Sequence, residues 1–333
     1  MSGPLLEVED LQVVVHSDHG PVPVVDGVSF RLGAGETLGI VGESGSGKSM
    51  LLRAVMGLGG GPVERRGRVA FDGVDLTELP PALLRRNWGN EIAMVLQNPM
   101  TCLNPVRTIG RQLVETLVFH SRADRRKAPG VALELLRSVG IPDPVRRLAQ
   151  HPHQLSGGMR QRVAIAIALA GGPRLLLADE PTTALDVTVQ AQILDLIDEQ
   201  RRLRDMAMIL VSHDLAVVAE HADTIAVMYA GQIVEQGPAR ELFAAPRMPY
   251  THLLLESIPR IDAPSHGRLA VVPGGPPDPG RMPGGCRFAS RCPYAQEQCR
   301  RDVPVLVDDD SGHAYRCWFP VAQAQPPRAA ARR

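Results

Sequence analysis

One segment near the N-terminus has the residue types of a phosphate-binding loop. It fits the spacing G-x-x-x-x-G-K-[ST] and lies between a short apolar run and a helical spacing. Its residues are Gly42, Glu43, Ser44, Gly45, Ser46, Gly47, Lys48 and Ser49. Glycines let successive backbone N–H groups face phosphates, and the start of a helix adds positive potential. The motif predicts that Lys48 contacts the β- and γ-phosphates of a nucleotide and that Ser49 binds Mg²⁺. The alternative is an ordinary Gly/Ser-rich turn, which the scarcity of lysine in this chain disfavours.

Two carboxylates end a second apolar run farther along the chain. Asp179 and Glu180 follow residues 175–178. Beside a bound nucleotide, Asp179 would hold Mg²⁺ through water, and Glu180 would act as general base on the attacking water. The alternative is an acidic pair that serves solubility or caps the next helix. His213, after the apolar run 208–211, supplies a side chain that could reach a γ-phosphate.

Elements that could position these groups are visible in the alternation of apolar runs and helical spacings. The runs 37–41, 92–96, 175–178 and 208–211 are too short for helices and end in polar or glycine residues, as buried parallel strands do. The amphipathic spacing over 189–203 predicts a helix between the last two. This is the βαβ pattern of an α/β domain with a parallel sheet.

Other segments predict additions to that core. Residues 6–15 and 24–32 predict an antiparallel β flank, and residues 225–236 predict a hairpin that turns at Ala230 and Gly231. Helical spacing over 80–170 predicts a helical insertion, with a subdomain at about 85–165. We predict a nucleotide-binding domain over 1–245, a small C-terminal extension over 246–320 and a disordered tail over 321–333.

Charge and hydropathy exclude several classes of protein. The 36 basic and 36 acidic residues balance to a formal net charge of zero, so no global field draws the chain onto nucleic acid. The longest apolar run, 163–170, is far shorter than the ~20 residues of a membrane helix. The first residues have neither the basic nor the apolar region of an export signal. We therefore expect a chain that is not exported and has no nucleic-acid partner.

A further motif carries a family resemblance. The stretch Leu-Ser-Gly-Gly-Met-Arg-Gln from Leu155 to Gln161 precedes a helical spacing, and its Ser-Gly-Gly could be a simple helix N-cap. It resembles the signature sequence of ATP-binding cassette (ABC) ATPases. Gln97 resembles the family's Q-loop glutamine, Ala184-Leu185-Asp186 its D-loop and His213 its switch histidine.

The resemblance implies roles for particular residues. It implies ATP and Mg²⁺ binding by residues 42–49 with Gln97 and Asp179, and catalysis by Glu180, His213, Gln97 and Lys48. It also implies contacts to nucleotide on a second ATPase domain. Those contacts would come from Ser156, Gly157, Gly158, Gln161 and Asp186. Family members usually carry an aromatic residue near the end of the first strand that stacks on adenine. Here His16 is the candidate, and a solvated loop histidine is the alternative.

Four segments narrow the resemblance. Residues 97–105, 181–190, 249–251 and 286–294 resemble the ATPase subunits of oligopeptide and dipeptide importers, a group that includes nickel and glutathione uptake systems. This implies an ATP-hydrolysing subunit, peripheral on the cytoplasmic face of the inner membrane. Its partners would be a second ATPase subunit, two transmembrane permease subunits and an extracytoplasmic substrate-binding protein. A soluble ABC ATPase of DNA repair or translation is the alternative from another class, and it is disfavoured because the chain has one signature and no heptad stretch.

Four cysteines near the C-terminus have the composition of a metal site. Cys286, Cys292, Cys299 and Cys317 follow a Pro/Gly-rich stretch, 273–285, which predicts irregular backbone. Disulfides are disfavoured because a reducing cytosol keeps thiols free. The spacing leaves tetrahedral zinc and an iron–sulfur cluster open. The resemblance implies a [4Fe–4S] cluster, because importer ATPases of this kind carry one on such a tail.

Overall fold

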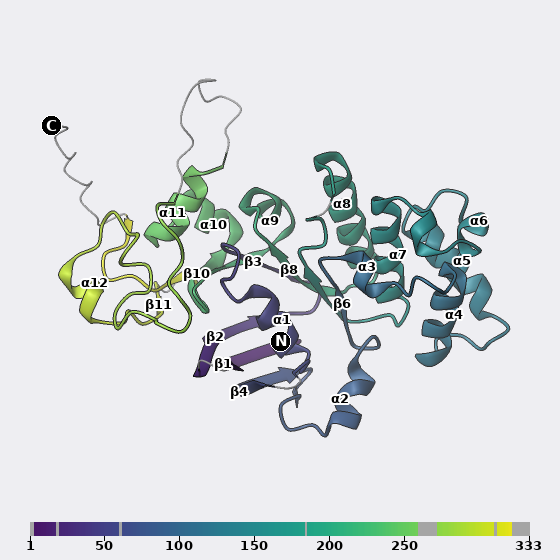
Figure 1. Ribbon diagram of the computed structural model, residues 1–333, viewed down its shortest axis with the longest axis horizontal. Coiled ribbons are helices and arrows are strands. Elements are labelled where there is room, and N and C mark those ends of the chain that lie inside the picture. Colours follow the sequence, from purple (N-terminus) through teal and green to yellow (C-terminus); the bar gives the residue numbers. More distant parts are fainter. Residues whose placement is uncertain are drawn as a thin grey trace. The chain divides into compact units, whose positions relative to one another are not determined.

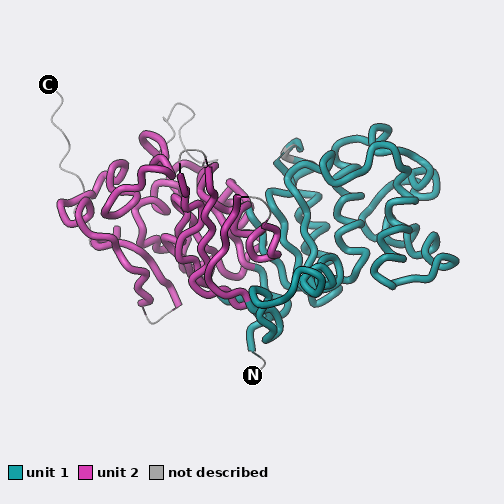
Figure 2. Tube along the Cα trace, turned by 60° about the horizontal axis from the view of Figure 1, so that its bottom comes forward, with its two compact units in different colours: residues 1–6, 31–37, 70–211 teal, residues 7–30, 38–69, 212–333 magenta. Residues whose placement is uncertain are grey.

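The computed structural model describes residues 3–17, 20–59, 62–183, 185–258, 272–309 and 312–321. The chain forms two compact units, which Figure 2 shows in separate colours. Unit 1 comprises Met1–Leu6, Arg31–Thr37 and Ala70–Val211, and unit 2 comprises Glu7–Phe30, Leu38–Val69 and Ser212–Arg333. Each unit is therefore assembled from segments that are distant in the sequence.

Three parallel strands form the core of unit 1. They are β6 (Ile92–Val95), β7 (Leu175–Asp179) and β8 (Ala207–Ser212), with β7 between the other two. The residues of β7 are buried along its whole length, which explains why residues 175–178 are a continuous apolar run. The register pairs Asp179 with Val211, so the acidic end of β7 lies level with the end of β8. These strands confirm the parallel sheet predicted from the apolar runs.

Helices precede and follow β6 and β7 in the sequence of unit 1. Five α-helices and one 3-10 turn lie between these strands and confirm the predicted helical insertion, and α4 packs on α5, α6 and α7 (Figure 1). They are α3 (Pro99–Cys102), α4 (Ile109–Phe119), α5 (Ala128–Ser138), α6 (Pro144–Leu148), the 3-10 turn Pro152–Gln154 and α7 (Gly157–Leu169). Helix α2 (Pro81–Asn87) precedes β6. Helix α8 (Val187–Leu203) joins β7 to β8, as the amphipathic spacing predicts.

Unit 2 contains most of the β flank. Strand β1 (Leu6–Ser17) lies between β2 (Gly20–Leu32) and β4 (Val63–Phe71). The last two residues of β4 belong to unit 1, where they pair with the short strand β5 (Val74–Asp75). The two predicted strands of the flank are therefore present as neighbours.

The second sheet of unit 2 presents the phosphate loop. Strand β3 (Thr37–Val41) runs parallel to β9 (Thr224–Tyr229), and β9 forms an antiparallel hairpin with β10 (Gln232–Pro238). The hairpin turns at Ala230 and Gly231, both with positive φ, as the sequence predicts. Helix α1 (Lys48–Val55) follows β3, and α9 (Leu215–His221) packs so closely on β3 that a Cβ on Gly39 would lie 2.0 Å from Val218 Cγ1.

The C-terminal part of unit 2 is anchored to β10. Strand β12 (Ala314–Tyr315) pairs with β10 and with β11 (Val307–Asp308). The fully buried Glu235 of β10 lies 2.8 Å from His313 Nε2 and accepts the Arg247 and Met248 backbone N–H groups. Helices α10 (Ala239–Ala244), α11 (Pro249–Glu256) and α12 (Glu297–Arg301) complete the unit. As predicted, residues 273–285 carry no helix or strand. Of the predicted tail, 321–333, only Val321 is described, and its N–H donates to the Arg247 carbonyl at 2.8 Å.

Candidate nucleotide and cysteine sites

The phosphate loop leaves β3 and enters α1 through three glycines with positive φ. The φ angles are 154° at Gly42, 78° at Gly45 and 102° at Gly47. A Cβ on Gly42 would lie 2.1 Å from the Met228 carbonyl oxygen, and one on Gly47 would lie 2.4 Å from the Val24 carbonyl oxygen. Only glycine meets both demands at these two positions, the positive φ and the close approach of a neighbouring backbone.

Lys48 closes this loop on itself. Its Nζ donates to the backbone carbonyls of Gly42 and Glu43, each at 2.9 Å, and the residue is 5% exposed. Ser46 is 4% exposed, and its hydroxyl has no hydrogen-bond partner among the described residues. Ser44 and Gly45 lie exposed at the tip of the loop. The loop is thus built around a buried cation, with its tip open to solvent, as a phosphate cradle requires.

Two residues missed by the sequence analysis hold Glu43 of the loop. The guanidinium of Arg291 forms a two-point ion pair with the Glu43 carboxylate, at 2.6 and 2.8 Å. The Glu43 backbone N–H donates to the Tyr250 hydroxyl at 2.9 Å. Residues 249–251 contributed to the family resemblance, but no sequence pattern pointed to either contact.

The carboxylate pair ends β7 in unit 1. Asp179 is 3% exposed, and Glu180 has a left-handed backbone, with φ of 45°. Gln97 Nε2 donates to Glu180 Oε2 at 3.2 Å, and the Thr183 hydroxyl donates to the same oxygen at 2.7 Å. The Glu180 backbone N–H donates to the Val211 carbonyl at 3.1 Å. The structure therefore brings two predicted site residues, Gln97 and Glu180, together and adds Thr183 to them.

The signature segment begins α7. The Ser156 hydroxyl accepts the Met159 N–H at 3.3 Å and caps the helix. This is the N-cap role that the sequence analysis gave as the alternative for the Ser-Gly-Gly segment. Ser156 and Gly157 are exposed and Gly158 is half-buried, so this helix start is open to an approaching partner. Gln161 lies deeper, 1% exposed, and its Nε2 has no hydrogen-bond partner among the described residues.

The remaining predicted nucleotide contacts lie at element ends. Asp186 is exposed and caps α8 by accepting the Val189 N–H at 3.0 Å, whereas Ala184 of the predicted D-loop lies outside the described residues. His213 is exposed and follows β8. His16 lies half-exposed near the end of β1, with its Nε2 3.2 Å from Glu64 Oε2.

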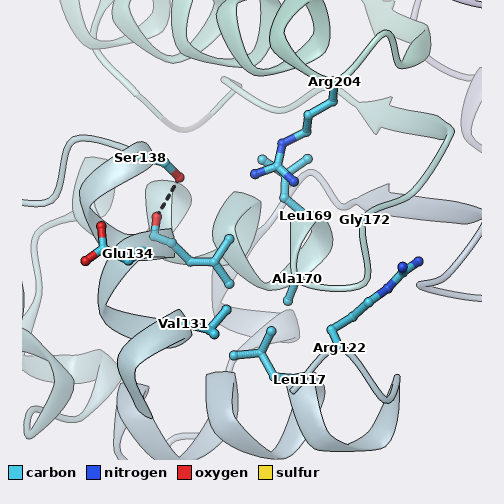
Figure 3. A pocket seen from close by; sticks show the side chains of 10 residues that line it. Leu117, Arg122, Val131, Glu134, Ser138, Leu169, Ala170, Gly172 and Arg204 are labelled. Carbon is cyan, nitrogen blue, oxygen red and sulfur yellow. Dashed lines mark hydrogen bonds between the residues drawn. The ribbon is translucent and has the colours of Figure 1, made fainter. Parts of the chain in front are cut away.

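The helical part of unit 1 contains a cavity that includes no predicted site residue. Figure 3 shows that side chains from α4, α5 and α7 line it, with Arg122 and Arg204 on its walls. The Ser138 hydroxyl donates to the Leu135 carbonyl at 2.9 Å (Figure 3).

The four predicted cysteine ligands line a single cavity in unit 2. Apolar and aromatic residues complete its lining, namely Met248, Pro249, Phe288, Ala289, Tyr294, Trp318 and Phe319. Burial raises the pKa of Cys286, that of Cys292 to about 11 and that of Cys317 to about 12. Within the described part of the chain, no three His, Cys, Asp or Glu side chains are arranged to hold one metal ion. The four thiols line one apolar space, and a metal that bound to them would have to displace their protons.

Comparisons with known proteins give matches to both the nucleotide-binding motifs and the C-terminal region of the chain. Residues 25–183 match the family described as ABC transporter, and residues 234–299 match the family described as oligopeptide/dipeptide transporter, C-terminal region. The dipeptide transport ATP-binding protein DppD of Escherichia coli is 46% identical over 328 residues, 97% of this chain and 99% of that protein. The oligopeptide transport ATP-binding protein OppD of Bacillus subtilis is 46% identical over 330 residues, 98% of this chain and 92% of that protein.

A solved structure supports the same assignment. The dimeric post-hydrolysis structure of the ATP-binding cassette MJ0796, bound to ADP and Pi, is 27% identical with a TM-score of 0.64, and the match covers 71% of this chain and 99% of that one. The fold class predicted from the sequence is thereby confirmed. The sequence matches to DppD and OppD span the phosphate loop, the signature segment and the C-terminal region. The chain is a member of the ABC transporter ATP-binding protein family, in its oligopeptide/dipeptide transporter branch.

Proposed function

We propose that this chain hydrolyses ATP to drive the import of dipeptides or oligopeptides through a membrane transporter. The observation that carries the proposal is the match over nearly the whole chain, C-terminal region included, to relatives named as dipeptide and oligopeptide transport ATP-binding proteins. Import of nickel or glutathione by the same machinery is the alternative that the sequence left open. The phosphate loop and the Gln97–Glu180 pair support the ATPase part of the proposal.

The proposed chemistry assigns a role to each group. Lys48 and the loop N–H groups bind the β- and γ-phosphates, while Ser49 and Asp179 hold Mg²⁺. Glu180 accepts a proton from a water molecule while the water oxygen attacks the γ-phosphorus. The bond between that phosphorus and the β–γ bridging oxygen then breaks. ADP and phosphate are the products. His213 is proposed to contact the γ-phosphate, Gln97 to sense Mg²⁺, and His16 to stack on adenine.

A second ATPase subunit is proposed to complete the site. The exposed start of α7, with Ser156 and Gly157, would face nucleotide held by the phosphate loop of that partner, as would Asp186. Gly158 and the buried Gln161 are proposed to contribute to the same contact. The solved dimer of the similar MJ0796 cassette supports pairing of two such chains.

Transport is proposed to need membrane partners. None of the helices in the described residues has the length and apolar character to cross a bilayer. We propose that two permease subunits form the path, that an extracytoplasmic protein supplies the substrate, and that this chain lies peripherally at the cytoplasmic face. Residues 246–320 would then be an extension added to a nucleotide-binding domain over 1–245.

The cysteine cavity is proposed to hold a [4Fe–4S] cluster, with zinc as the alternative. Cys286, Cys292, Cys299 and Cys317 would be its ligands, since all four line the cavity. A bound cluster would supply a rigid cross-link or a one-electron redox centre. The aromatic lining, Phe288 and Trp318 among it, would exclude water from the ligands.

The test of the proposed function is uptake by the reconstituted importer. The chain would be assembled with its permeases and binding protein in liposomes, with ATP on the side of the ATPase subunits. Labelled dipeptide and oligopeptide, nickel and glutathione would be offered separately. ATP-dependent accumulation of peptide is expected. Accumulation of nickel or glutathione alone would contradict the peptide assignment and leave the ATPase intact.

A further inference from the structure

Arg291 connects the cysteine-bearing segment to the phosphate loop within unit 2. Its side chain is 4% exposed, and its two terminal nitrogens donate to the two oxygens of the Glu43 carboxylate at 2.6 and 2.8 Å. Such a two-point pair fixes both the distance and the plane of the carboxylate. Glu43 is the second residue of the phosphate loop, and Arg291 follows it by 248 residues.

The surroundings of Arg291 restrict its side chain. Its Nε donates to the Pro273 carbonyl at 2.7 Å, and its terminal nitrogens also reach the Gly274 carbonyl at 3.2 Å and the Tyr229 hydroxyl at 3.2 Å. The guanidinium lies 5.7 Å from the ring centre of Tyr229 and 5.8 Å from that of Phe288. A buried arginine with its donors satisfied in this way has little rotamer freedom left, so it holds the Glu43 carboxylate at a fixed position.

The backbone of Glu43 is held as well as its side chain. Its N–H donates to the Tyr250 hydroxyl, and its carbonyl accepts Lys48 Nζ, both at 2.9 Å. The Tyr250 ring packs in tilted orientations against Tyr229 and Phe288, at ring-centre distances of 4.7 and 5.3 Å, so the three rings form one aromatic cluster. Lys48 and Tyr250 are therefore linked through the backbone of one residue, Glu43.

The same turn places Arg291 and two of the cysteines. Arg291 and Cys292 both donate their backbone N–H to the Phe288 carbonyl at 3.0 Å, and Ala289 donates to the Cys286 carbonyl at 3.0 Å. Phe288 lines the cysteine cavity and also lies under the guanidinium. A change in how Cys286 and Cys292 are held would move Arg291 with them.

We propose that Arg291 is a positioning residue for the phosphate loop, through which the fold of the cysteine-bearing segment sets the affinity of this ATPase for nucleotide. The proposal rests on the proposed function in taking a nucleoside phosphate as the ligand of the loop. Arg291 touches no substrate in this scheme. It holds Glu43 and, through the Glu43 carbonyl, Lys48, so less freedom is lost when nucleotide binds. A purely structural ion pair would change stability and leave affinity unchanged.

The experiment measures the Kd of the full chain for MgADP by calorimetry. Arg291→Met, which keeps the apolar stem and removes the donors, is expected to raise the Kd roughly tenfold. Glu43→Gln is expected to raise it by a similar factor, and the double variant by no more than either change alone, because both remove one interaction. Arg291→Lys keeps the charge but not the two-point geometry and should recover part of the affinity.

Arg247→Met is the matched control. Arg247 pairs with Asp309 at 3.4 Å in the same unit, and its hydrogen-bond partners in the described part of the chain lie outside the loop, so this variant should keep the wild-type Kd. Hydrogen exchange of residues 43–48 without nucleotide gives a second readout and should speed up in Arg291→Met but not in Arg247→Met.

Two results would overturn the proposal. One is a wild-type Kd with wild-type loop exchange in Arg291→Met. The other is a wild-type Kd in Glu43→Gln. This variant decides the question if Arg291→Met does not fold, because it leaves the Arg291 contacts to Pro273 and Gly274 in place. Failure of the wild-type chain to bind MgADP at all would instead overturn the nucleotide role of the loop, and the inference with it.

Discussion

Glu180 has a left-handed backbone at the end of a buried strand, and two side chains donate to one of its carboxylate oxygens. Positive φ is uncommon outside glycine, and here it turns the chain so that the Thr183 hydroxyl can reach back to the carboxylate. Glu180 and Gln97 were predicted from motifs, but Thr183 was not. The role of Thr183 depends on this turn, and the positive φ of Glu180 that makes the turn cannot be read from the sequence pattern.

Thr183→Val tests the positioning of this carboxylate. The substitution keeps the shape of the side chain and removes the donor at 2.7 Å. We expect hydrolysis by the assembled importer to fall roughly ten- to a hundredfold, because small displacements of a reacting group are costly. ATP binding should be unchanged. Thr183→Ser restores the hydroxyl and should recover most of the rate; equal activity in Thr183→Val and the wild type would show that the contact is incidental.

At the scale of elements, buried strands and amphipathic helices were predictable because each has a repeating pattern of burial. Strand β7 and helix α8 lie where the apolar run and the helical spacing placed them, and the β9–β10 hairpin turns at the predicted Ala230 and Gly231. The anchoring of the C-terminal segment was not predictable. It depends on single long-range contacts, such as Glu235 with His313, which leave no periodicity in the sequence.

Glu235→Ala should loosen this anchor. Glu235 is fully buried and accepts hydrogen bonds from two backbone N–H groups as well as facing His313, so its removal leaves buried donors without partners. We expect a loss of about 3 to 5 kcal/mol in the free energy of unfolding, measured by chemical denaturation. The control is Glu256→Ala, which removes a half-exposed pair with His252 and should cost about 1 kcal/mol or less. Equal effects of the two changes would contradict the anchor.

Gly39→Ala tests the contact between β3 and α9. The added Cβ would lie 2.0 Å from Val218 Cγ1, so the helix must shift away from the sheet. We expect a loss of about 1 to 3 kcal/mol in the free energy of unfolding. Gly59→Ala is the control, because a Cβ there meets nothing within 4 Å. A neutral Gly39→Ala would mean that α9 does not pack on β3 in this way.

The proposed cluster at the four cysteines can be tested by the metal content of the purified chain. After anaerobic purification with its partner subunits, the chain should contain about four irons and four sulfides and absorb near 400 nm, as a [4Fe–4S] cluster does. Cys292→Ser should remove this signal, because Cys292 lines the same cavity as the other three. One zinc without iron would make the segment a structural zinc fold instead.

At the scale of the whole molecule, the motifs of one ATPase are shared between two units. The phosphate loop, His213 and the cysteines belong to unit 2, whereas Gln97, the signature and Glu180 belong to unit 1. Family membership was predictable because these motifs follow one another in a fixed order. The link from Arg291 to Glu43 was not, because it joins an irregular segment to a loop 248 residues away.

The most direct test of Glu180 as the general base is ATP hydrolysis by the assembled importer with the wild-type chain and with Glu180→Gln, measured together with ATP binding. We expect peptide-stimulated hydrolysis in the wild type. We expect almost none in Glu180→Gln, because the general base is gone while Lys48, Ser49 and Asp179 remain to bind MgATP. Retained binding with lost hydrolysis would support Glu180 as the base. Near-normal turnover in Glu180→Gln would contradict it.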